Sequence, residues 1–221
     1  LAAGSHDRRR KGLEQLLPSM PKTSHSDPDE LEKVIELEGA ETISAFIGEP
    51  VIGAAAGAYV PPDDYWTRIS EICAQHDILV IADEVMTGFG RLGATMGHEA
   101  LGFTPDIIAA GKGLGGGYVP IGGVYCRPEV VEPIGKTDLA LMFYTFAGQD
   151  LCCSVARKVL EIVRTENLVA QAAAMGNLLR ERLEEEFRDH PNVEAIRGRG
   201  LLQGLGLVAD RETGDPFPRS A

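Results

Sequence analysis

The sequence predicts an α/β fold in which helices flank a mostly parallel β-sheet. Short apolar runs alternate with stretches whose apolar residues recur at helical spacing, a pattern typical of βαβ units. The runs are apolar at nearly every position, which favours strands covered on both faces. The chain has 221 residues, 44% of them hydrophobic, enough to bury a sizeable core. We therefore expect one large α/β domain and part of a second.

The first half of the chain alternates helices with strands. Asp27 and Pro28 are typical of the start of a helix, and Asp63 is expected to cap a second one. The second helix has an apolar face at helical spacing. The expected strands are 43–47, 78–82 and 107–110.

A polar side chain follows each of these three strands: Glu49, Asp83 and Lys112. Functional groups of parallel sheets gather at the carboxyl ends of the strands. Lys112 stands out because the glycine-rich run 111–117 cannot bury its side chain. Such a lysine can form an imine with a carbonyl cofactor if its ammonium is desolvated or lies near other cations.

Helices dominate the second half, after a further expected strand at 122–126. Helical stripes run through 151–163 and through 179–187, and both are typical of core-facing helix surfaces. A last strand pair, 193–197 and 201–208, is expected to be interrupted by Gly198-Arg199-Gly200. We place a domain boundary near Glu166, so that residues 1–165 belong to the large domain and 166–221 begin a smaller α+β domain.

Composition excludes several classes of protein. A formal net charge of -12 argues against binding to nucleic acid or to an anionic membrane. The basic run 8–11 is short and is interpreted as a solvated surface patch. No apolar segment approaches the roughly 20 residues that span a bilayer, and no signal peptide is recognised. We expect a cytoplasmic enzyme.

The cysteines and histidines do not indicate a metal site or a disulfide framework. The four cysteines lack CxxC spacing, so we expect reduced and mostly buried thiols. The five histidines lack metal-ligand spacing, and no metal is assigned.

Two parts of the sequence resemble nucleotide-binding motifs. The run from Gly111 to Gly116 matches GxGxxG, but that fingerprint must open a helix, and the following residues 118–123 cannot form one. The run 78–84 imitates a Walker B strand, yet the chain contains no GxxxxGK[ST]. A P-loop ATPase is the last alternative, because it leaves Lys112 without a role.

Asp83 and Lys112 have a joint explanation if a pyridine ring lies across the strand ends. A carboxylate beside the ring nitrogen stabilises its protonated form, and a lysine on the opposite side holds the ring's aldehyde as an imine. The protonated ring then withdraws electrons from the carbon attached to the substrate nitrogen, which is the chemistry of pyridoxal phosphate.

Five motifs extend this interpretation. They are Glu49-Pro50-Val51, Asp83-Glu84-Val85 with Thr87-Gly88-Phe89-Gly90-Arg91, Pro105-Asp106-Ile107, the run 111–117, and Thr145-Phe146-Ala147-Gly148. Over roughly residues 25–208, their order and spacing resemble those of the class III pyridoxal-phosphate aminotransferases. The resemblance implies an aspartate-aminotransferase-like fold, called fold type I, truncated at both ends, with an active site shared across a homodimer.

By the same resemblance, Lys112 is the Schiff-base lysine and Asp83 the partner of the pyridine nitrogen. Val85, two residues on and so on the same strand face, is the apolar residue under the ring. Thr145 reaches the cofactor phosphate of the neighbouring subunit; alternatively its own turn satisfies its hydroxyl. Glu49 pairs with a mobile arginine, so that the site can admit both a carboxylate and an uncharged amine substrate. Alternatively, Glu49 is solvated or paired locally.

The resemblance implies transamination, in which an amino group moves from an amine or amino acid to a keto acid with pyridoxal 5'-phosphate as cofactor. Two alternatives stay open: an aminomutase or decarboxylase of the same family, and a truncated chain that dimerises without catalysis. The phosphate-binding turn and ring-stacking aromatic residue are expected before Leu1, and the substrate-carboxylate arginine after Ala221.

Overall fold

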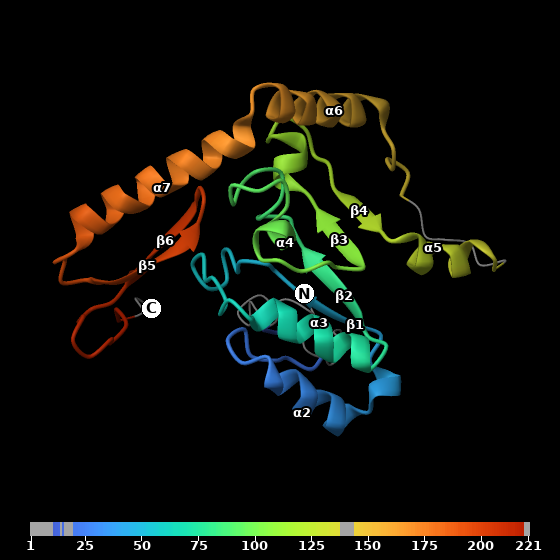
Figure 1. The fold of residues 1–221 in the computed structure, drawn as a ribbon, viewed down its shortest axis with the longest axis horizontal. Helices are drawn as coiled ribbons and strands as arrows, with labels where there is room; N and C mark the ends of the chain where they lie inside the picture. The colour runs from blue at the N-terminus through green and yellow to red at the C-terminus, as the bar shows by residue number, and fades with distance from the viewer. Residues whose placement is uncertain (1–10, 14, 16–19, 138–143, 219–221) are drawn as a thin grey trace.

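The computed structural model describes residues 11–13, 15, 20–137 and 144–218. Its main sheet has four strands in the order β1-β2-β3-β4. The first three run parallel, and β4 runs antiparallel to β3 (Figure 1). The predicted mostly parallel sheet is confirmed. The strands are β1 (Ala45–Gly48), β2 (Leu79–Asp83), β3 (Ile107–Ala110) and β4 (Gly123–Cys126).

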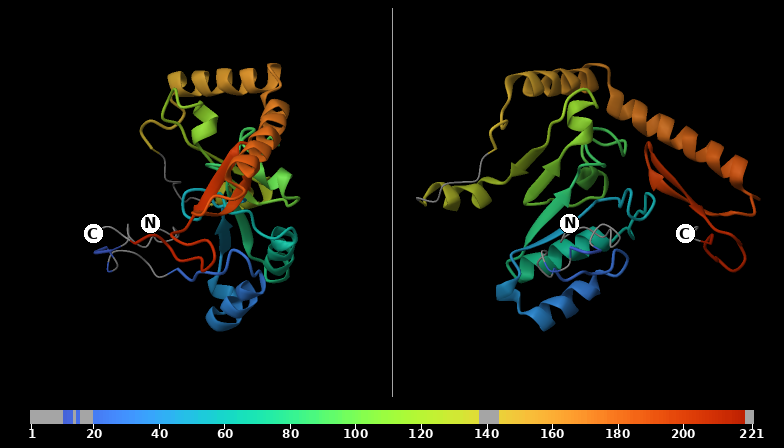
Figure 2. Two further views of the ribbon diagram at one scale, coloured as in Figure 1. Left: turned by 90° about the vertical axis from the view of Figure 1, so that its left-hand side faces the viewer. Right: turned by 180° about the vertical axis from the view of Figure 1, so that it is seen from behind.

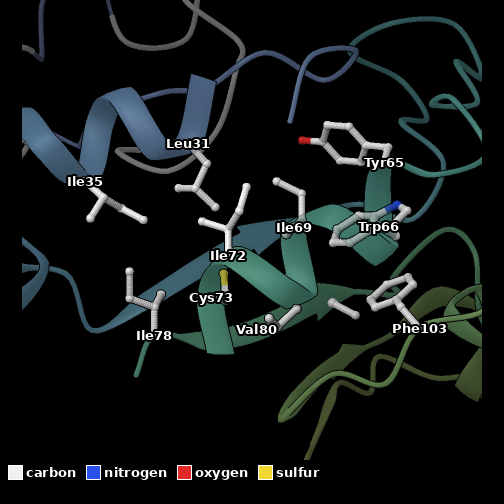
Figure 3. Close-up of a cluster of buried hydrophobic side chains, with 11 residues drawn as sticks. Leu31, Ile35, Tyr65, Trp66, Ile69, Ile72, Cys73, Ile78, Val80 and Phe103 are labelled. Carbon is white, nitrogen blue, oxygen red and sulfur yellow. The ribbon is translucent and has the colours of Figure 1, made fainter. Parts of the chain in front are cut away.

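Two helices and β2 form the main core. α3 (Tyr65–Gln75) lies between α2 (Asp29–Glu38) and the strands, and apolar side chains from all three meet there (Figure 3). The Trp66 ring stacks on Phe103 with centroids 4.1 Å apart. Each fully buried side chain of this size contributes about 1.5–3 kcal/mol.

The predicted cap of α3 is wrong. The helix begins at Tyr65 with Asp64 at the N-cap position, and no side chain caps it. The Tyr65 N–H instead donates to the Pro62 carbonyl at 3.0 Å, so a backbone turn replaces the expected Asp63 cap. At α2, the Asp27 carboxylate accepts from the Asp29 N–H, close to the predicted start.

The second half is helical, as predicted, and ends in a hairpin (Figures 1 and 2). α6 and α7 lie at the opposite end of the molecule from α2 and α3. The elements are α5 (Pro128–Gly135), α6 (Asp150–Thr165), α7 (Leu168–Phe187), β5 (Val193–Arg199) and β6 (Leu202–Leu207).

The expected interruption of the hairpin is shorter than predicted. β5 continues through Gly198 and Arg199, and the turn is confined to Gly200 and Leu201. A Cβ added to Gly198 would lie 2.0 Å from the Leu202 carbonyl oxygen, so this glycine allows the two strands to approach. The Leu201 N–H donates to the Arg91 carbonyl at 3.0 Å, which ties the hairpin to the loop after β2.

The prediction of mostly buried thiols is wrong. All four cysteines are free, but only Cys73 is buried, while Cys126 and Cys153 are exposed. β4 and α6 carry the other three on surfaces that no described element covers fully. Within the described residues, no helix is long and apolar enough to cross a membrane.

Candidate active site

The carboxyl ends of β1, β2 and β3 lie side by side. Gly48 pairs with Ala82, and Asp83 pairs with Ala109. Glu49 directly follows β1, Asp83 ends β2, and Lys112 begins a short 3-10 helix, η3 (Lys112–Gly115), after β3. The carboxyl ends of the three strands are adjacent (Figure 1), so the three polar residues predicted from the strand ends share one edge of the sheet.

Lys112 is held in an unfavourable backbone conformation. Its φ is +38°, in the left-handed region, which costs a residue with a Cβ about 1–2 kcal/mol. The loop persists because η3 buries Leu114 and ends at Gly116, which has φ +58°. The Lys112 side chain is exposed, and its ammonium makes no hydrogen bond or ion pair with any described residue. The fold positions this amine without giving it a partner.

Asp83 has one free carboxylate oxygen. Its Oδ1 accepts from the Val85 N–H at 3.1 Å, while no described residue donates to Oδ2. The residue is half-buried at the end of its strand. An ionised carboxylate accepts hydrogen bonds through both oxygens, so Oδ2 is available to a cationic or N–H group.

The predicted position of Val85 on the β2 face is wrong. β2 ends at Asp83, and Val85 lies in the turn that the Asp83 carboxylate closes. The side chain nevertheless reaches the lysine loop: a Cβ added to Gly111 would lie 3.6 Å from Val85 Cγ1. An apolar surface therefore lies next to the residue that precedes Lys112.

Glu49 is paired locally. Its Oε2 accepts from the Gly53 N–H at 2.9 Å, so one of the two interpretations of this residue is visible in the chain. Its part in substrate recognition stays a prediction.

Among the residues that the structure describes, Thr145 makes no hydrogen bond to the strand edge. It lies in an exposed turn that the Ala147 N–H closes on the Tyr144 carbonyl at 2.8 Å. Its hydroxyl makes no hydrogen bond with any described residue, so the backbone alone satisfies this turn. The neighbouring Tyr144 and Phe146 are 72% and 81% exposed.

Sequence reasoning missed Glu84, which is completely buried. Its carboxylate accepts from the Thr87 hydroxyl, from the N–H groups of Gly97 and His98, and from His98 Nδ1. The position of Glu84 did indicate burial, because an acidic residue directly after a buried strand has little access to water. The donors could not be named from sequence, since they lie 3 to 14 residues away with no regular spacing.

Together, these residues form a donor set with a definite chemistry. An unpartnered primary amine can bond covalently to a carbonyl group. A half-buried carboxylate with a free oxygen can hold a protonated ring nitrogen, and an adjacent valine offers an apolar surface to a planar ring. Among the described residues, no group of acidic, histidine or cysteine side chains is arranged to hold a metal ion.

Comparison with known proteins shows the family of the chain. The family model "Aminotransferase class-III" matches residues 3–219, and the chain belongs to that family. A putrescine–pyruvate aminotransferase of Pseudomonas aeruginosa is 40% identical over 189 residues, which are 86% of this chain and 41% of that protein. A chloroplastic gamma aminobutyrate transaminase of Solanum lycopersicum is also 40% identical, over 85% of this chain and 36% of its own length.

Solved transaminase structures share the fold. An (S)-enantioselective omega-transaminase from Thermomicrobium roseum superposes with a TM-score of 0.83 at 43% identity, covering 86% of this chain and 42% of its own. A Bacillus anthracis aminotransferase gives a TM-score of 0.82 at 40% identity, over 87% of this chain and 43% of its own. The expected fold type I is confirmed, and the chain spans about two fifths of the length of most of these relatives.

Proposed function

We propose that the protein carrying this chain is a pyridoxal-phosphate-dependent transaminase that works as a cytoplasmic homodimer. It moves an amino group from an amine or amino acid to a keto acid. The observation that carries the proposal is the Lys112 ammonium, which has no partner among the described residues and lies at the sheet edge that also presents Asp83. Relatives named for putrescine and gamma aminobutyrate, and one named as an omega-transaminase, support this class of reaction.

Each residue of the strand edge has one task in this proposal. Lys112 would hold the aldehyde of the cofactor through Nζ, and the free Nζ would move the proton of the substrate carbon as general base and then acid. The free Oδ2 of Asp83 keeps the pyridine nitrogen protonated, and Val85 packs beneath the ring. When bound, pyridoxal phosphate supplies an electron sink for the carbon next to the substrate nitrogen.

Two further residues connect the site to its surroundings. Thr145 donates its hydroxyl to the cofactor phosphate of the other subunit, and its exposed position, without a hydroxyl partner among the described residues, supports this role. Glu49 takes part in substrate selection through Oε1, because Oε2 is already bound to Gly53.

The remaining alternatives make different products. An aminomutase needs no second substrate, a decarboxylase releases carbon dioxide, and a transaminase requires a keto acid. The relatives named above are all transaminases, which favours the last. A chain that dimerises without catalysis would fail to bind the cofactor in a titration of the complete protein.

Lys112→Ala tests the proposal. In the complete protein, this variant is expected to lose the absorbance of the lysine-linked cofactor and all measurable turnover, because the Lys112 amine forms the bond to the cofactor in this proposal. Lys158→Ala is the matched control, since Lys158 is an exposed lysine on α6 whose Nζ is paired with Glu161 at 2.9 Å. Covalently linked cofactor in Lys112→Ala would refute the proposal.

A further inference from the structure

Glu84 is a fully buried carboxylate whose two oxygens each have two hydrogen-bond partners. Oε2 accepts from the Thr87 hydroxyl and from the Gly97 N–H at 2.8 Å. Oε1 accepts from the His98 N–H at 2.7 Å and from His98 Nδ1 at 2.9 Å. A carboxylate without water is costly unless it is fully hydrogen-bonded, and this one is.

These bonds close the loop that leaves β2. Gly97 and His98 begin the short helix α4 (Gly97–Ala100), so Glu84 joins the start of the loop to its end. Packing at this joint is tight: a Cβ added to Gly97 would lie 2.7 Å from Glu84 Oε2 and 2.8 Å from Thr87 Cβ. No side chain larger than hydrogen fits at Gly97 without moving the carboxylate.

Glu84 is connected to Asp83 through the peptide group that joins Glu84 to Val85. The peptide between Glu84 and Val85 donates its N–H to Asp83 Oδ1 at 3.1 Å, and its carbonyl accepts from the Gly88 N–H at 3.0 Å. Rotation of this peptide would withdraw the only donor that orients the Asp83 carboxylate among the described residues. Anchoring the Glu84 side chain therefore restricts the peptide that aims Asp83.

We infer that Glu84 is a positioning residue of the cofactor site: it fixes the loop 84–98 and through it the Asp83 carboxylate. The inference rests on the proposed function, in which Asp83 faces the pyridine nitrogen. It gives Glu84, Thr87 and His98 a role without contact to cofactor or substrate.

The geometry requires a carboxylate at this position rather than an amide. Each Glu84 oxygen faces one backbone N–H, from Gly97 on one side and from His98 on the other. A glutamine would direct its NH₂ group at one of them in either orientation, and a backbone N–H cannot become an acceptor. Glu84→Gln therefore leaves a buried donor unsatisfied although it preserves shape and volume.

The test compares Glu84→Gln with Asp83→Asn in the complete protein. The readout is the dissociation constant of pyridoxal phosphate from the apo-protein, measured well below the unfolding temperature. Both variants are expected to bind the cofactor at least about tenfold more weakly. Glu99→Gln is the matched control: the same change at an exposed residue of α4, whose carboxylate accepts from the Met96 N–H, should leave the constant unchanged.

A second pair keeps the test independent of folding defects. Thr87→Val removes the hydroxyl that donates to Glu84 and should weaken cofactor binding, whereas Thr87→Ser retains the hydroxyl and should restore it. Amide hydrogen exchange at Gly97 and His98 in the apo-protein should accelerate in Glu84→Gln and Thr87→Val but not in Thr87→Ser.

The outcomes separate the two claims. Unchanged cofactor affinity in Asp83→Asn would contradict the proposed function. Weaker affinity in Asp83→Asn with unchanged affinity in both Glu84→Gln and Thr87→Val would overturn the positioning role and leave the proposed function standing.

Discussion

The sheet edge that carries Asp83 and Lys112 differs from the segment that carries Thr145 in how much support this chain supplies. Asp83 ends a strand whose Val80 and Ala82 are buried, and Glu84 closes the loop that follows. Thr145 lies between exposed aromatic residues in a turn held by backbone hydrogen bonds. The first region is supported by the buried core of this chain, whereas the second exposes apolar side chains to solvent.

This difference separates two kinds of active-site residue. Residues that act on the reacting atoms need a fixed geometry, and the packed strand edge provides it. A residue that contacts the cofactor phosphate can instead come from an exposed segment, provided that another subunit covers that segment. The comparison favours a shared active site in which each chain holds its own Lys112 and lends its Thr145.

The largest expected effect is at the packed edge. Asp83→Asn keeps the shape of the side chain but removes its charge, so the ring nitrogen loses its ionic partner. Breaking such a pair costs about 3–5 kcal/mol, which is roughly a 200- to 5,000-fold loss in kcat/KM. Steady-state kinetics of the complete protein would measure this loss.

Asp106→Asn is the matched control for Asp83→Asn. Asp106 precedes β3 at the other end of the sheet, where it accepts from the Val80 N–H at 2.8 Å and pairs with the exposed Arg127. Activity should be retained there. Equal losses in both variants would mean that the charge at the strand end has no special role.

Stability should distinguish the two regions in the same way. Trp66 is 2% exposed, so Trp66→Ala is expected to lower the free energy of unfolding by about 3–5 kcal/mol. Phe146 is 81% exposed, so Phe146→Ala should lower that free energy by less than about 0.5 kcal/mol. Phe146→Ala should instead weaken the dimer in analytical ultracentrifugation. Strong destabilisation of the monomer by Phe146→Ala would contradict the difference in support between the two regions.

A smaller effect is expected at Thr145. Thr145→Val removes one hydrogen bond to a charged phosphate, worth about 1.5–3 kcal/mol, and should weaken cofactor affinity about tenfold or more. Thr145→Ser keeps the hydroxyl and should bind like the wild type. If both variants bind cofactor normally, the phosphate is held by other residues.

The smallest expected effect, about 1.4 kcal/mol between pH 8 and 10, is a pH dependence of the core. Burial raises the pKa of Cys73 from its ordinary value of 9.0 to about 12. Stability from the neutral thiol is therefore complete below pH 9 and is lost as the pH rises toward 12, by about 1.4 kcal/mol per unit. Cys73→Ala should flatten the unfolding free energy between pH 8 and 10, and Cys126→Ala, at an exposed site, should not. An equal slope in wild type and Cys73→Ala would contradict this assignment.

The placement of the strand-end residues could be predicted because continuous apolar runs mark the strands of a parallel sheet, although the expected burial is only partial in β1, where Ile47 is 46% exposed. Once three such strands were recognised, parallel geometry required Glu49, Asp83 and Lys112 to share an edge. The pattern could not show where β2 ends. β2 ends at Asp83, whose carboxylate accepts from the Val85 N–H, so Val85 lies in the turn and not on the strand face.

Glu84 shows a second limit of sequence patterns. An acidic residue after a strand can be solvated or can be buried and hydrogen-bonded. Glu84 is buried because Thr87, Gly97 and His98 donate hydrogen bonds to its carboxylate. The exposed cysteines were missed for a related reason. Periodicity predicts which helix face is apolar, but not whether a described element covers it.

The most direct test of the central claim is to locate the cofactor on the chain. The complete protein would be loaded with pyridoxal phosphate, reduced with borohydride, digested with trypsin and examined by mass spectrometry. Trypsin does not cleave at a modified lysine, so we expect the added mass within peptide 92–136, with fragment ions that place it on Lys112. Added mass on any other lysine, or an unmodified Lys112 under conditions of full turnover, would contradict the account.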